Sequence, residues 1–104
     1  RLLPYLRARL YLGLSRPDQA YESYISAMWR YRQVDSCLAM VSEMASAGYP
    51  SKALQLLDIA TEVLKGQESR KLKRSRESYE RDIAYLRNVL QDDLATVNAA
   101  KDAG

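Results

Sequence analysis

The stretch AYESYISA at residues 20–27 recurs in outline as ALQLLDIA at residues 53–60. In both stretches an alanine is followed four positions later by a large apolar residue, and three positions after that by a second alanine. The second stretch therefore follows the first at one constant offset, from Ala20 to Ala53 and from Ala27 to Ala60. Small residues at this spacing let two helices approach closely, and the large residue fills the gap between neighbouring hairpins. The repetition predicts antiparallel helical hairpins stacked as a short α-solenoid.

Apolar residues at helical spacing predict five helices around these two stretches. The first covers about 3–14 and carries the leucines that define it: Leu3, Leu6, Leu10 and Leu14. The second covers about 16–32, the third begins after Asp35, and the fourth begins after Ser51. The fifth and longest, about 69–97, is expected to cap the stack or to link it to a neighbouring domain.

These helices predict one helical-repeat domain over residues 1–97, with hairpins at about 2–32 and 35–65 and a flexible tail at 98–104. Ser15, Asp35 and Ser51 are the predicted N-caps, because their side-chain oxygens can accept hydrogen bonds from the first turn of a helix. Gly48 and Gly66 are the predicted helix stops. The chain begins with Arg rather than Met, and we expect it to be part of a longer protein.

The composition favours an all-α protein without catalytic chemistry. With 104 residues, 47% of them apolar, the chain can bury a continuous core, and it has only four Gly and three Pro. It has no histidine and one cysteine, so it cannot assemble the common zinc sites or a Ser-His or Cys-His pair. Cys37, on an apolar helix face, is interpreted as a core residue. We expect no enzyme activity, no cofactor and no metal, and no membrane span, because arginines interrupt the most apolar stretch.

The repeat resembles the tetratricopeptide repeat, a helical hairpin with a period of about 34 residues. The first copy matches its pattern at Ala8, Tyr11, Ala20, Tyr24 and Ala27, and the second at Met40, Met44, Gly48, Ala53, Leu57 and Ala60. The chain departs from the pattern where Trp is usual (Pro4 and Cys37), at Arg7 and Val41, and in lacking the closing Pro. The resemblance covers about residues 2–66.

The pentatricopeptide repeat, an RNA-binding hairpin of similar length, is the alternative. Residues 43–48 (EMASAG) and 53–57 (ALQLL) also resemble it. Its usual Tyr-Asn pair is missing, and Ala27 and Ala60 lie where its second helix usually carries Met. The tetratricopeptide resemblance is therefore preferred.

The tetratricopeptide resemblance implies a concave groove lined by the first helix of each hairpin. The residues that it would place in the groove are Tyr5, Arg9, Leu12, Leu38, Ser42 and Ala45. This mixture suits an extended or helical peptide with some apolar character, with Tyr5 and Arg9 as anchors. The competing interpretation is that these side chains pack against a neighbouring helix. The carboxylate clamp of chaperone-binding members is not reproduced.

Five basic residues open the predicted fifth helix: Arg70, Lys71, Lys73, Arg74 and Arg76. They could contact phosphates or an acidic partner. The competing interpretation is a solvated helix face in which Lys73 pairs with Glu77 and Arg76 with Glu80, four residues apart. Net charge is +3 for the whole chain, which is too mild for a dedicated DNA binder.

The sequence as a whole predicts a protein-protein interaction scaffold that binds a partner peptide or helix in its groove. RNA binding through the basic cluster is the alternative function. Self-association or a missing neighbour is also expected, because two recognisable units are fewer than the roughly three that such stacks need for stability.

Overall fold

The chain is all-helical in the computed structural model, which describes residues 3–103. Five α-helices and one short 3-10 helix account for its regular structure, and the described residues contain no strand. The elements are α1 (Pro4–Gly13), α2 (Pro17–Tyr31), α3 (Val34–Ser46), α4 (Pro50–Gly66), η1 (Ser69–Lys71) and α5 (Arg76–Ala103). The all-α prediction and the number of α-helices are confirmed.

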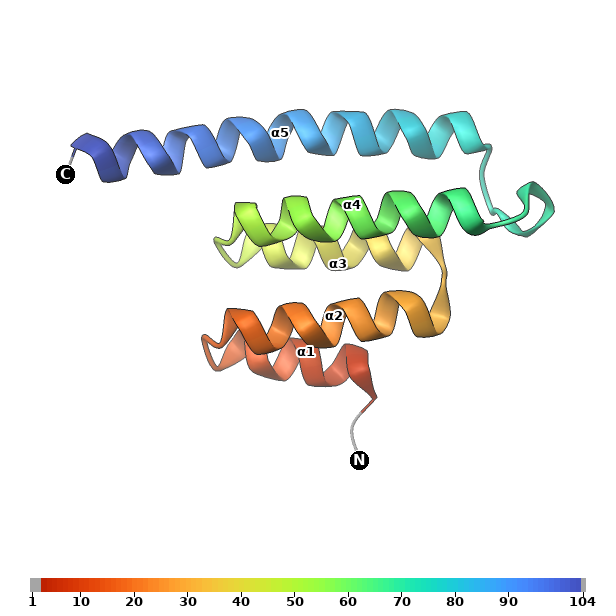
Figure 1. Cartoon of the computed structure of the whole chain (residues 1–104), viewed down its shortest axis with the longest axis horizontal. Helices are drawn as coiled ribbons and strands as arrows, with labels where there is room; N and C mark the ends of the chain where they lie inside the picture. The colour runs from red at the N-terminus through yellow and green to blue at the C-terminus, as the bar shows by residue number, and fades with distance from the viewer. Residues whose placement is uncertain (1–2, 104) are drawn as a thin grey trace.

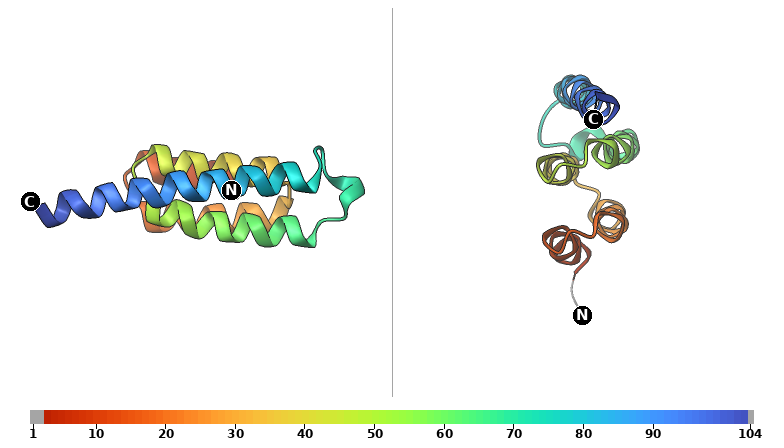
Figure 2. Two further views of the ribbon diagram at one scale, coloured as in Figure 1. Left: turned by 90° about the horizontal axis from the view of Figure 1, so that it is seen from above. Right: turned by 90° about the vertical axis from the view of Figure 1, so that its left-hand side faces the viewer.

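The helices form two antiparallel hairpins with a long helix laid over the second (Figure 1). α1 packs along α2, α3 packs along α4, and α2 joins the hairpins by packing on α4 and α3. Seen end on, α1 and α3 lie on one side of the stack and α2 and α4 on the other (Figure 2). The molecule is flat, with extents of 50 × 36 × 15 Å, because it is only two helices thick below α5.

The offset that relates the two alanine stretches extends to the backbone of the two hairpin turns. Ser15 and Gly48 are separated by this same offset, and both have positive φ, at 57° and 97°. Pro17 and Pro50 then open α2 and α4, where a proline costs no helical hydrogen bond. The same backbone hydrogen bond closes both turns: Arg16 N–H to the Tyr11 carbonyl (2.9 Å) and Tyr49 N–H to the Met44 carbonyl (3.2 Å). The two hairpin turns therefore have the same hydrogen-bonding pattern and a left-handed residue at the same position.

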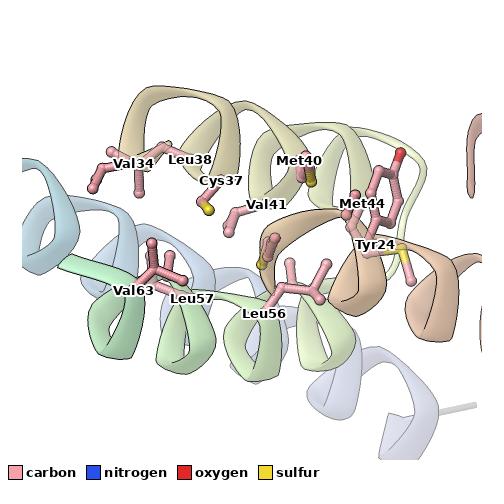
Figure 3. Close-up of a cluster of buried hydrophobic side chains, with 14 of the residues drawn as sticks. Tyr24, Val34, Cys37, Leu38, Met40, Val41, Met44, Leu56, Leu57 and Val63 are labelled. Carbon is pink, nitrogen blue, oxygen red and sulfur yellow. The ribbon is translucent and has the colours of Figure 1, made fainter. Parts of the chain in front are cut away.

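The recurring alanines lie in the core, as the repeat predicts. Their side chains are 0% exposed: Ala20, Ala27, Ala53 and Ala60. Tyr24 and Leu57, the large residues between them, are also fully buried. In Figure 3, Leu57 and Val63 of α4 face the apolar side of α3, and Tyr24 of α2 reaches Met44. Small side chains on α2 and α4 thus let the hairpins approach closely.

Apolar spacing also predicts Tyr31 in the buried stripe of the second helix and Leu72 in the fifth helix, and the structure differs at both residues and at the four leucines of α1. Tyr31 is 41% exposed, because it is the last residue of α2 and lies beyond the packed part of the hairpin. Leu72 packs on the core from the connection before α5, not from the helix itself. The four leucines from which α1 was predicted are on its exposed side, and the helix instead buries Pro4 and Ala8.

The three predicted N-caps are wrong. The cap positions are occupied by Arg16, Gln33 and Tyr49, and none makes a side-chain capping hydrogen bond. Two of these helices begin with proline, whose fixed φ favours the helical start without a capping side chain. Ser15 is used for the left-handed turn, and Asp35 is used for a contact with α5.

The start of α5 is also different from the prediction. Ser69–Lys71 forms an isolated 3-10 turn, and the α-helix begins at Arg76. Ser75 caps it, since its Oγ accepts a hydrogen bond from the backbone N–H of Ser78 at 3.1 Å. The helix continues to Ala103, past the expected boundary at 97. The mobility of the tail stays a prediction.

The late start of α5 has a tertiary cause. The Arg76 guanidinium donates to the backbone carbonyls of Leu64 (2.7 Å) and Gln67 (2.6 Å), near the C-terminal end of α4. The Leu64 carbonyl also accepts a hydrogen bond from the Gln67 N–H at 3.2 Å. A cation is favoured at this negative end of the helix dipole, where the last carbonyls lack their usual helical partners. The connection folds back on α4 before α5 can begin.

Candidate functional site

Two hollows lie along the face of the stack that α1, α3 and α5 share. The first, about 510 Å³, lies between α1 and α3 and is lined largely by apolar and small side chains, including Leu6, Ser36 and Met40. The second, about 320 Å³, lies between α3 and α5. Ala39 lines both hollows. The two hollows therefore flank α3, and together with Ala39 they are called the α3 groove below.

The groove residues predicted from the sequence are only partly brought together. Tyr5 lines the first hollow, and Leu38 and Ser42 line the second. Leu12 and Ala45 are partly buried against the core and line neither hollow, so they support the helices that form the groove. Leu38 is only 9% exposed, which leaves little of it for a partner.

Tyr5 is held in place by Glu43, a residue that sequence reasoning missed. The hydroxyls of Tyr5 on α1 and Tyr24 on α2 both donate to the Glu43 carboxylate on α3, Tyr24 at 2.7 Å. Arg9 lies 3.8 Å from the same carboxylate and 5.7 Å from the centre of the Tyr5 ring. These contacts tie α1 and α2 to α3 at the edge of the first hollow.

The electrostatics of this cluster keep both hydroxyls protonated. The hydrogen bond to Glu43 raises the pKa of Tyr5, and burial adds to the effect. Burial is the main cause that raises the pKa of Tyr24, followed by its hydrogen bond to Glu43. Because the Tyr5 hydroxyl is committed to Glu43, a partner in the groove would meet its ring. Arg9, with a side chain 60% exposed, is the accessible cation beside it.

The five basic residues at the predicted start of the fifth helix do not form one patch. Arg70 pairs with Glu68 at 2.7 Å, and Arg76 binds the end of α4. Lys73 precedes the helix, and Arg76 donates to backbone carbonyls, so the pairs expected with Glu77 and Glu80 are not formed. The prediction that all five open the long helix is wrong for four of them.

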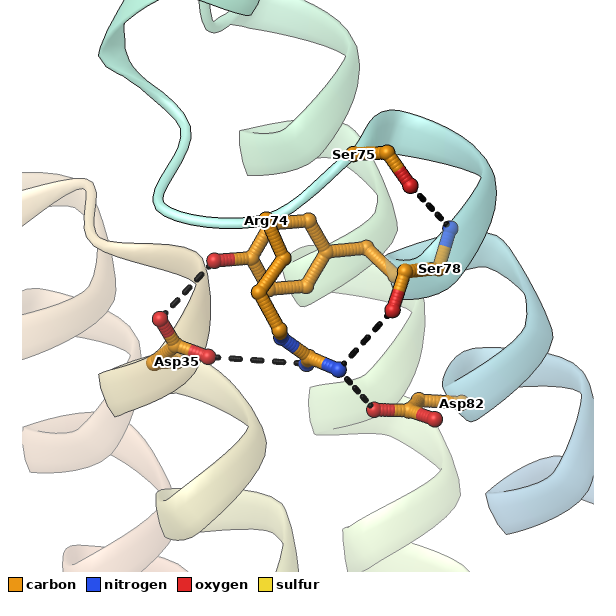
Figure 4. Close-up of polar contacts among 6 residues, drawn as sticks. Asp35, Arg74, Ser75, Ser78 and Asp82 are labelled. Atoms are coloured by element: carbon orange, nitrogen blue, oxygen red, sulfur yellow. Dashed lines mark hydrogen bonds and ion pairs between the residues drawn. The ribbon is translucent and has the colours of Figure 1, made fainter.

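Arg74 is part of a polar cluster that joins α5 to α3 (Figure 4). Its guanidinium lies 2.8 Å from Asp82 and 3.5 Å from Asp35, and it stacks 4.3 Å from the centre of the Tyr79 ring. The hydrogen bond to Asp82 raises the pKa of Arg74, so the charge is retained. This arginine therefore holds the fold together and is not free for a ligand.

A different set of cations gathers at the end of α2. Arg30 and Arg32 line a hollow of about 380 Å³ together with Lys71 and Lys73. Within residues 3–103, none of these four side chains is within 4 Å of a carboxylate oxygen. We call this hollow the basic pocket. Sequence reasoning missed it because Arg30 and Lys71 are far apart along the chain and meet only through packing.

Other kinds of site receive no support from the described part of the chain. No group of three or more His, Cys, Asp or Glu side chains there could hold a metal ion. No helix in residues 3–103 is long and apolar enough to cross a membrane. Cys37 is 1% exposed, which confirms that it is a core residue, and burial raises its pKa to about 12. The thiolate, the reactive form of cysteine, is therefore disfavoured.

Comparisons of the chain with protein-family models, with curated proteins and with solved structures found no significant match. The resemblance to the tetratricopeptide repeat stays a prediction from the sequence.

Proposed function

We propose that this chain is a protein-interaction module of the tetratricopeptide-repeat type, which binds a partner peptide or helix in the α3 groove. The observation that carries the proposal is the pair of hollows that share Ala39. Because Ser36, Ala39 and Ser42 are small, a ligand can approach the α3 backbone between the rows of larger side chains on α1 and α5.

The groove also has the mixed character that peptide binding needs. Leu6 and Tyr31 provide an apolar rim on one side, and Tyr85, which is 69% exposed, provides an aromatic rim on the other. Aromatic and arginine side chains are the usual anchors of protein interfaces, and Arg9 lies beside the first hollow. The helices hold this surface in place before a partner arrives, so little ordering entropy is lost on binding.

A peptide selection tests the proposal. Peptides selected from a random display library on the wild-type chain are labelled, and their affinity is measured by fluorescence anisotropy. Ala39→Glu places a charge between the two hollows and is expected to weaken the selected peptides by at least about tenfold. Ala95→Glu, the same change at an exposed position on α5, is the matched control. Selected peptides that bind Ala39→Glu and wild type equally well would contradict the proposal.

The basic pocket favours a second candidate function, binding to RNA phosphates. Four cations and one carboxylate, Asp35, line this hollow, and the excess of positive charge attracts a polyanion. A single-stranded RNA should lose affinity steeply as salt rises, in proportion to the phosphates contacted. The double variant Lys71→Glu with Lys73→Glu should nearly abolish binding. Arg74 and Arg76 are unsuitable for this test, because they stabilise the fold.

A further inference from the structure

The first helix exposes an unusually apolar side. Four leucines spaced three, four and four residues apart lie along one side of α1, two within the helix and two at its caps. Each is about half exposed: Leu3 48%, Leu6 50%, Leu10 50% and Leu14 54%. We call these residues the leucine face. The opposite side of the helix is the one that packs on α2, through Pro4 and Ala8. A face of this kind, with no charged residue inside it, is uncommon on the surface of a soluble helix.

The internal repeat indicates what the leucine face is built to contact. The shift that superposes Ala20 on Ala53 also superposes Leu10 on Glu43. Glu43 is the residue by which α3 holds the preceding hairpin, through hydrogen bonds from two tyrosines. The same shift superposes Leu3 and Leu6 on two residues that line the hollow between α3 and α1, namely Ser36 and Ala39. The leucine face therefore occupies the positions with which a hairpin of this repeat packs on its predecessor.

The opposite end of the stack is formed by α5, whose outer side is more polar. Apart from the exposed Tyr85, the outward side of α5 carries charged and amide side chains, and these are exposed: Glu77, Arg81, Asn88 and Asp92. In stacked repeats, the terminal helix usually has a polar outer side that contacts water. One end of this stack is therefore capped, and the other presents leucines.

The charges beside the leucine face indicate the chemistry of its occupant. Residues 1–17 contain four arginines and no acidic residue. Arg7 and Arg9 lie on either side of the leucines in helical projection, and Arg9 remains 60% exposed. We infer that the leucine face of α1 is a docking site for an amphipathic partner helix whose apolar stripe is flanked by acidic residues. The leucine face adjoins the α3 groove, because Leu3 and Leu6 also line the first hollow. Leu10 and Leu14 line neither hollow of the groove, so substitutions at these two residues test the leucine face separately.

A second copy of the same face is a poorer occupant. Two α1 helices packed leucine to leucine would bring Arg7 and Arg9 of each copy towards those of the other, and like charges across an interface are unfavourable. Stable protein interfaces also use about 20–30 residues on each side, and this face is formed by one ten-residue helix. Acidic residues on the partner helix avoid this repulsion and can form ion pairs with Arg7 and Arg9.

The test uses synthetic helical peptides of about 20 residues, long enough to be partly helical alone. Both peptides carry leucines at helical spacing, one flanked by Glu and the other by Lys. Fluorescence anisotropy is expected to show that the wild-type chain binds the Glu-flanked peptide at least about tenfold more tightly than the Lys-flanked one. The double variant Leu10→Glu with Leu14→Glu should lose at least about tenfold in affinity for the Glu-flanked peptide. Val97→Glu, at an exposed apolar residue on α5, should leave that affinity unchanged.

Three results would overturn the inference. The first is equal binding of the Glu-flanked peptide to wild type and to the double variant, with circular dichroism showing both folded. The second is a wild-type dimer in sedimentation that the double variant makes monomeric, which would assign the face to a second copy. The third is binding to anionic phospholipid vesicles, lost in the double variant, without binding of either peptide. Each measurement is repeated with the variant Leu10→Ser with Leu14→Ser, which removes the two apolar side chains without adding charge.

Discussion

The Tyr79 hydroxyl on α5 donates a 2.8 Å hydrogen bond to the Asp35 carboxylate on α3, 44 residues earlier in the chain. The Arg74 guanidinium lies over the Tyr79 ring and reaches the same carboxylate. Tyr79, Arg74 and Asp35 thus form one polar cluster, which connects the first turn of α5 to the first turn of α3. Several measurable properties depend on contacts of this kind.

Tyr79→Phe removes this hydrogen bond and keeps the buried ring. We expect the free energy of unfolding, measured by urea denaturation, to fall by roughly 1–3 kcal/mol, because the acceptor is charged and loses a partner. Tyr85→Phe is the matched control, since Tyr85 lies on the same helix and is 69% exposed. An unchanged stability for Tyr79→Phe would show that water replaces the hydroxyl at no cost.

The two turns of the repeat predict opposite effects for matched substitutions. Gly48→Ala should destabilise the chain by roughly 1 kcal/mol, because φ is +97° and an L side chain is strained there. No atom lies within 4 Å of the added Cβ, so the cost comes from the backbone alone. Ser15→Gly, at φ 57°, should instead stabilise by roughly 0.5–1 kcal/mol. Thermal denaturation of both variants checks the pair, and effects of the same sign would contradict it.

The buried alanines predict sensitivity to added volume. Ala60→Leu should cost roughly 1–3 kcal/mol, because Ala60 is 0% exposed in the helix that packs on both α2 and α5. Ala95→Leu, at an exposed position of α5, is the control and should be nearly neutral. Urea denaturation of the two variants measures the difference. If Ala60→Leu were as stable as wild type, close helix approach at this position would be unnecessary.

Alkaline pH is expected to destabilise the fold. The pKa values of Tyr5 and Tyr24 are raised above the usual value of about 10 in the folded chain. Above pH 10 the unfolded chain therefore binds fewer protons than the folded chain, and the free energy of unfolding falls as pH rises. Stability from this source is complete below pH 10 and is lost progressively above it. Urea denaturation between pH 8 and 11 measures the slope, and Tyr24→Phe should make it shallower.

Cys37 is expected to be protected from thiol reagents while the chain is folded. Burial raises its pKa to about 12, so almost none of the thiol is ionised at pH 8. Labelling with a chromogenic disulfide reagent at pH 8 should be slow in buffer and fast in urea. Its dependence on urea should follow the unfolding transition measured by circular dichroism. Rapid labelling of the native chain would mean that α3 opens locally.

The helical structure and the internal repeat could be predicted from the sequence, because both depend on the spacing of residue types along the chain. Alanines at positions 20, 27, 53 and 60 predicted the buried seam between hairpins, and their complete burial confirms it. Gly48 predicted the stop of α3, since a left-handed residue ends the helix there. Three of the six predicted groove residues line the α3 groove, namely Tyr5, Leu38 and Ser42.

Contacts between distant segments could not be predicted in this way, because one sequence does not show which elements meet. Apolar spacing predicted α1, but only packing decides that Ala8 is buried and that the leucines are exposed. Glu43 joins two tyrosines from two other helices, and the basic pocket joins the end of α2 to the connection before α5. The start of α5 at Arg76 likewise depends on carbonyls at the end of α4. Hydrophobic periodicity shows which side of each helix is apolar. Only the packing of the helices decides which of these sides is buried, and against which neighbour.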